Sequence, residues 1–91
     1  MYKFRLFVSG FGSKSSQMAI EQVRRILDAN FADDYAMSIV DVVDDPACAR
    51  RKFIFATPVL VKHAPPPERR VFGSFKDSKK VLKSLGLTNG N

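Results

Sequence analysis

Four prolines in the second half of the chain restrict its fold more than any other feature. Pro58 stands at the start of the apolar run Val59-Leu60-Val61, and Pro65, Pro66 and Pro67 follow shortly after it. Proline has a fixed φ and no backbone N–H, so it is tolerated at the first residue of a strand but not inside a helix or a central strand. The pattern predicts a strand over residues 59–62 entered through Pro58, and then an extended spacer at the three prolines.

Apolar residues alternate at the start of the chain. Residues 2–8 have the period of a strand, which places one face in a core and leaves Phe7 as the one aromatic plausibly exposed on the other face. The core-facing residues are Tyr2, Phe4, Leu6 and Val8. Further strands are predicted over residues 37–43 and, antiparallel to the strand at 59–62, over residues 70–72.

Three helices are predicted from apolar periodicity and from capping residues. Each follows a side chain that can accept a hydrogen bond from a free backbone N–H of the first turn. The helices and their caps are residues 16–30 after Ser15 or Ser16, residues 46–52 after Asp45, and residues 78–85 after Asp77. Pro46 suits the first helical position, and Gly86 suits the residue that ends the last helix.

The order βαβ, α, ββ, α predicts an α/β fold of the thioredoxin-like type. The first strand, helix and second strand would form a parallel βαβ unit. Ninety-one residues give one domain, ordered from about residue 2 to residue 87, with a polar tail at residues 88–91 that we expect to fray. Such a chain buries a small core, so self-association would be a natural source of further burial. No apolar run is long enough to cross a membrane and no leader is visible, so a cytoplasmic protein is expected.

Positive charge is concentrated in the second half of the chain. Residues 1–49 hold five Lys and Arg against seven Asp and Glu, a net charge of −2, whereas residues 50–91 hold ten against two, a net charge of +8. This asymmetry favours an acidic partner for the second half, either a protein surface or a nucleic acid.

The residues for redox, metal or cofactor chemistry are not found in the expected pattern. Thioredoxin-like redox sites need a cysteine at the start of the first helix, where residues 12–17 contain none, and Cys48 is the only cysteine. His63 is the only histidine, and Gly10-Phe11-Gly12 is too short a match to a nucleotide-binding loop. We therefore expect no catalytic residue, no metal and no cofactor.

The basic clusters of the second half are the candidate binding residues. They alternate in the sequence with Phe53, Phe55, Phe72 and Phe75, which are read either as core aromatics behind a solvated basic face or as part of a binding surface. The candidate partner-binding residues are Arg50, Arg51, Lys52, Lys62, Arg69 and Arg70. A protein partner is favoured, and a basic nucleic-acid-binding module is the alternative, because strand alternation leaves few aromatics exposed for stacking on bases.

Five segments in matching order and spacing resemble the KaiB family of circadian clock proteins. They are Leu6-Phe7-Val8-Ser9-Gly10, Val40-Asp41-Val42, Ala56-Thr57-Pro58, Pro65-Pro66-Pro67 and Gly73. The resemblance implies a non-catalytic protein that binds the ring ATPase KaiC and thereby recruits or excludes other clock proteins.

The resemblance also implies two folds for one sequence. KaiB proteins are described as thioredoxin-like when bound to their partner and as a differently folded homotetramer at rest. A homotetramer or dimer is therefore expected here. The structural or switch residues would be Pro58, preceded by a cis bond, together with Pro65, Pro66, Pro67 and Gly73. A longer loop at residues 11–16 and the lack of the usual acidic tail leave open whether the output is circadian timing or stress adaptation.

Overall fold

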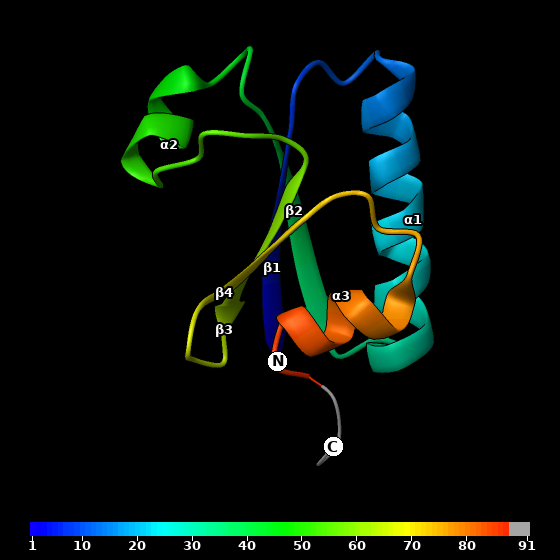
Figure 1. The fold of residues 1–91 in the computed structure, drawn as a ribbon. Coiled ribbons are helices and arrows are strands. Elements are labelled where there is room, and N and C mark those ends of the chain that lie inside the picture. The colour runs from blue at the N-terminus through cyan, green and yellow to red at the C-terminus, as the bar shows by residue number, and fades with distance from the viewer. Residues whose placement is uncertain (88–91) are drawn as a thin grey trace.

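The computed structural model describes residues 1–87, in which a four-stranded sheet separates two layers of helices (Figure 1). The strands are β1 (Tyr2–Val8), β2 (Tyr35–Asp41), β3 (Val59–Ala64) and β4 (Arg69–Phe72), in the order β2-β1-β3-β4. β1 runs parallel to β2 and antiparallel to β3, and β4 runs antiparallel to β3. Helices α1 (Lys14–Phe31) and α3 (Ser78–Ser84) lie on one face of the sheet and α2 (Pro46–Arg51) on the other (Figure 1).

The larger core lies between the sheet and the helices α1 and α3. Alternation along β1 turns Phe4, Leu6 and Val8 toward this layer, as the sequence predicted, and all three are at most 2% exposed. They pack with side chains at helical spacing, which are Val23 and Leu27 of α1 and Val81 of α3. Burial of each such side chain stabilises the fold by about 1.5–3 kcal/mol.

A smaller core lies under α2, and it corrects the prediction for Phe7. Phe7 is fully buried there against Cys48, Val59 and Val61. The prediction of an exposed Phe7 was wrong because both faces of β1 are covered at this end of the sheet. An aromatic that is buried in this way cannot stack on a base.

The helix caps are mostly those predicted. The side chains of Asp45 and Asp77 accept from the backbone N–H groups of Cys48 and Lys80, at 3.0 Å and 3.2 Å. Gly86 has a φ of +73° and follows the C-cap of the last helix, Leu85, as its position predicted. The first helix begins two residues earlier than predicted, because Ser13 rather than Ser15 or Ser16 accepts from the N–H of Ser16.

The second strand also differs from its predicted range, since it ends at Asp41 rather than at residue 43. A turn follows at once, in which Asp44 and Asp45 donate their N–H groups to the carbonyl oxygen of Asp41. The third strand is longer than predicted and reaches Ala64, and the peptide bond before Pro58 is cis, as the resemblance implied. The predicted tail at residues 88–91 lies outside the described residues.

The Asp41 carboxylate connects β2 to the loop before α1. It is 7% exposed and accepts from the backbone N–H groups of Gly10, Phe11 and Val43, at 2.8–2.9 Å. These hydrogen bonds, first the one from Gly10, hold the pKa of Asp41 below its ordinary value. The loop that precedes α1 is thus fixed by a residue about thirty positions further along the chain.

We expect acid to remove this stabilisation. Because the pKa of Asp41 is lower in the folded chain than its ordinary value of 3.8, the carboxylate stabilises the fold above a pH of about 4. Its contribution is lost as the pH falls from there through the lowered pKa. Urea unfolding between about pH 6 and pH 2 should show a shallower loss of stability for Asp41→Asn than for the wild type. Equal slopes for the two proteins would contradict this role.

Candidate partner-binding surface

Exposed aromatic and basic side chains gather around α2 and the outer strand of the sheet. We call this region the basic–aromatic surface; it comprises Arg50, Arg51, Lys52, Phe53, Phe55, Arg70 and Phe72. The exposed fractions of Phe53, Phe55 and Phe72 are 68%, 89% and 56%. Large exposed aromatics concentrated in one region are typical of interaction sites.

Local geometry explains why two of these phenylalanines point outward. The chain reverses after α2, where Phe53 has a φ of +56° and Ile54 donates its N–H to the carbonyl oxygen of Ala49 at 2.9 Å. Ile54 then packs against the smaller core, and its neighbours on either side face solvent. The interpretation of Phe53, Phe55 and Phe72 as core aromatics is therefore wrong, and it holds only for Phe75, which is 1% exposed.

Arg70 joins β4 to the end of α2. Its guanidinium group donates from Nη1 to the carbonyl oxygen of Phe53 at 3.0 Å and from Nη2 to that of Lys52. Glu68 lies 3.8 Å from the same group. Arg70 is thus a structural part of the basic–aromatic surface, and it holds the exposed Phe53 in place.

Arg69 and Lys62 lie on the opposite face of the sheet. Neighbouring residues of a strand point to opposite sides, so Arg69 projects toward Gly86 at the end of α3 while Arg70 projects toward α2. Lys62 pairs with Arg69 in the sheet and is only 4% exposed. The structure therefore brings Arg50, Arg51, Lys52 and Arg70 together and separates Arg69 and Lys62 from them.

The buried ammonium group of Lys62 holds the proline spacer. Its Nζ donates to the carbonyl oxygens of Pro65 and Pro67, at 2.6 Å and 3.0 Å. Burial, and then the nearby charge of Arg69, lower the pKa of Lys62. We assign Lys62 a structural role in this fold, because its polar group faces the chain's own backbone.

Gly73 lies against Pro58, so two of the predicted switch residues are in contact. Gly73 donates its N–H to the carbonyl oxygen of Pro58 at 3.0 Å. A Cβ atom at Gly73 would stand 2.6 Å from the Pro58 ring, closer than real contacts allow. The requirement for glycine here comes from this close approach.

The single cysteine and the single histidine have surroundings typical of structural residues. The Cys48 thiol is buried in the smaller core. His63 is half-buried, and its pKa is lowered by burial and then by the charge of Arg5. Its Nδ1 lies 3.8 Å from Glu68.

Within residues 1–87, no three His, Cys, Asp or Glu side chains are placed to hold a metal ion. In the same range, no helix is long and apolar enough to cross a membrane.

Comparison with known proteins identifies the family. The family model described as the KaiB domain matches residues 5–87. The chain belongs to the KaiB family. The circadian clock oscillator protein KaiB of Prochlorococcus marinus strain NATL2A is 40% identical over 86 residues, which cover 94% of this chain and 79% of the relative. The protein KaiB1 of Synechocystis is 37% identical, with coverage of 94% and 81%.

Solved structures show that this member of the KaiB family has the thioredoxin-like fold. The N-terminal domain of Synechococcus elongatus SasA aligns with a TM-score of 0.73 at 22% identity, covering 99% of this chain and 88% of that domain. Thioredoxin 1 of Thermosipho africanus aligns with a TM-score of 0.69 at 16% identity, covering 92% and 90%. The predicted family and fold class are thus confirmed.

Proposed function

We propose that this KaiB-family protein is a non-catalytic clock regulator that binds a ring ATPase of the KaiC type. Binding would modulate the phosphorylation cycle of the ATPase or its recruitment of other clock proteins. The family supports a regulatory role in a circadian clock. The observation that carries the proposal is the basic–aromatic surface, which presents three exposed phenylalanines beside four cationic side chains.

This combination suits a protein interface. Aromatic and arginine side chains supply most of the binding free energy in typical interfaces, because they bury much surface and donate several hydrogen bonds. The cations Arg50, Arg51 and Lys52 would face an acidic patch on the partner and accelerate the encounter. The binding residues in this proposal are those three together with Arg70 and the exposed phenylalanines.

We further propose that the resting protein is a homotetramer or dimer in which the second half of the chain adopts another fold. The exposed Phe53, Phe55 and Phe72 support self-association, because an assembly that covers them would remove apolar surface from water. A partner that binds the thioredoxin-like form more tightly than the resting form would shift the population toward it. Light scattering at micromolar concentration tests the assembly, and a monomer throughout that range would rule it out.

The test of function is binding to a cognate KaiC-type ATPase in biolayer interferometry, after incubation for a full day. We expect a complex that weakens with salt and loses at least about tenfold in affinity in the double variant Arg50→Glu/Arg51→Glu. The matched control is Lys79→Glu/Lys83→Glu, which changes the net charge equally but lies on α3, across the sheet. No complex, or an equal loss in the control, would refute the proposal.

A nucleic-acid-binding module is the second candidate. The exposed phenylalanines favour it, because single-stranded nucleic acids stack their bases on aromatic rings beside cations. Gel-shift assays with single-stranded oligonucleotides at physiological salt separate the two functions. A nucleic-acid binder would retain the oligonucleotide with a steep dependence on salt, whereas the clock regulator would not retain it.

A further inference from the structure

A groove runs along α1 on the face of the sheet opposite the basic–aromatic surface. One wall is α1, and the other is the segment of residues 73–78 together with Pro58. Three adjoining hollows share Gln22 and Lys76 and follow the helix from Lys14 to Asn30. We call them together the α1 groove.

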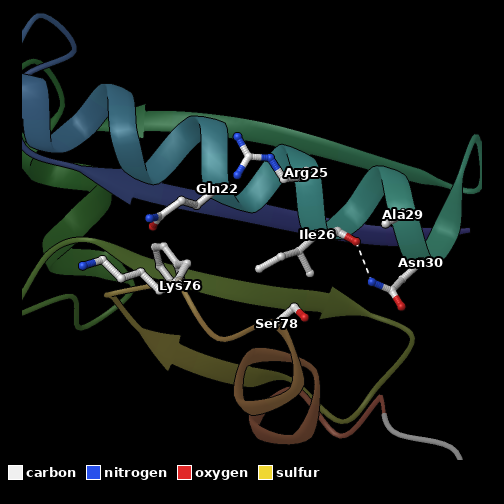
Figure 2. Close-up of a pocket in the computed structure, with 8 residues that line it drawn as sticks. Gln22, Arg25, Ile26, Ala29, Asn30, Lys76 and Ser78 are labelled. Carbon is white, nitrogen blue, oxygen red and sulfur yellow. Dashed lines mark hydrogen bonds between the residues drawn. The ribbon is translucent and has the colours of Figure 1, made fainter.

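Figure 2 shows the hollow toward the end of α1, where Gln22 lies across from Lys76 and Ile26 lies across from Ser78. Its volume is about 370 Å³, and that of the hollow toward the start of α1 is about 450 Å³. The helix rises about 1.5 Å per residue, so the wall from Lys14 to Asn30 is about 24 Å long. An extended peptide of about seven residues has this length.

The side chains of the α1 groove set the chemistry of its occupant. Lys14 and Lys76 supply positive charge, whereas Arg25 is paired with the one lining carboxylate, Glu21, at 3.0 Å. At the start of α1, Met18 is 51% exposed and lies with Pro58 in the same hollow. Methionine adapts its shape to different apolar side chains. The charge and shape of the α1 groove therefore suit a ligand that carries acidic side chains around one apolar side chain.

We propose that the α1 groove binds an extended acidic segment of a partner protein, with an apolar side chain seated between Met18 and Pro58. A protein segment is favoured over a nucleic acid because the aromatic of the groove, Phe75, is 1% exposed and offers no face for base stacking. Gln22 and Ser78 add polar groups that can pair with a peptide backbone. The site lies across the sheet from the surface assigned to the ATPase, so both can be occupied at once.

The experiment is fluorescence anisotropy with a labelled, end-blocked seven-residue probe that carries acidic residues around one leucine. We expect Lys14→Glu/Lys76→Glu to weaken binding at least about tenfold, because it reverses two charges at the groove. The matched control Lys3→Glu/Arg5→Glu carries the same change in net charge on the other face of the sheet, outside both proposed surfaces, and should weaken binding less than about twofold. In the wild type, the probe should shift the amide signals of residues 14–30 and 73–78.

Three results would overturn this inference. The first is no saturation by the probe at concentrations up to about 1 mM. The second is an equal loss of affinity in the two double variants, which would show attraction by net charge alone. The third is equal or tighter binding of a seven-nucleotide thymidine oligomer. Because the probe contains no ATPase, these results are independent of whether the ATPase binds.

Discussion

Replacing Phe53 and Phe55 together by serine is expected to weaken binding of a KaiC-type ATPase by about a hundredfold to a thousandfold. Truncating an aromatic hot spot typically costs about 2 kcal/mol, and two of them would cost about 4 kcal/mol if their effects add. The side chains are 68% and 89% exposed, so their loss should change the free energy of unfolding by less than about 0.5 kcal/mol. Titration calorimetry gives the affinity, and urea unfolding gives the stability.

The matched control for this variant is Phe11→Ser. Phe11 is also exposed, at 41%, but it lies in the loop before α1 and outside the basic–aromatic surface. Its replacement should leave the affinity within about twofold of the wild type. A loss of less than about tenfold in the double variant, or a comparable loss in the control, would show that the exposed aromatics do not anchor the partner.

Alanine at Gly73 is expected to destabilise the thioredoxin-like fold by about 2–3 kcal/mol, near the upper end of the range for overpacking. The new methyl group would stand 2.6 Å from the Pro58 ring and 3.3 Å from Phe75. A proline ring cannot rotate away, so the backbone must shift and strain the hydrogen bond between Gly73 and Pro58. Urea unfolding at neutral pH measures the effect.

Gly12→Ala is the control, because a Cβ atom at Gly12 meets nothing within 4 Å. It should change the free energy of unfolding by less than about 0.5 kcal/mol. Equal stability of the two variants would contradict the packing argument. Under the proposal of a second, assembled fold, Gly73→Ala should also enrich the assembly in light scattering, because it weakens the competing form.

The sequence predicted those parts of the fold that depend on neighbouring residues. Asp45 and Asp77 cap their helices because a cap needs only a side-chain acceptor within reach of the next N–H groups. The predicted end of β2 was wrong because the β-branched Val42 and Val43 continue the strand pattern, whereas the chain turns at Asp41, whose carbonyl oxygen accepts from Asp44 and Asp45. The carboxylate of Asp41 also bonds to a loop about thirty residues earlier, and no local pattern reveals that contact.

The sequence predicted which basic residues belong to the second half of the chain, but not on which face of the sheet each of them lies. Adjacent residues of a strand point to opposite faces, so the sequence could have placed Arg69 and Arg70 on different faces of the sheet once the strand was assigned. The sequence could not predict the exposure of Phe53 and Phe55, because Ile54, which lies between them, fills the space beneath α2. In an irregular segment, no period decides which aromatic enters the core.

The structure describes three strand pairings in residues 1–87, and only the pairing of β1 with β3 joins the two halves of the sequence. The first half closes on itself through β1, α1 and β2, whereas β4 reaches the rest of the sheet through β3 alone. Opening that ladder would release the β3–β4 hairpin as one cooperative unit and leave the parallel pair intact. A partner that binds Arg70 therefore contacts an edge strand that reaches the rest of the sheet through β3 alone, and its binding would favour the arrangement in which this hairpin stays docked.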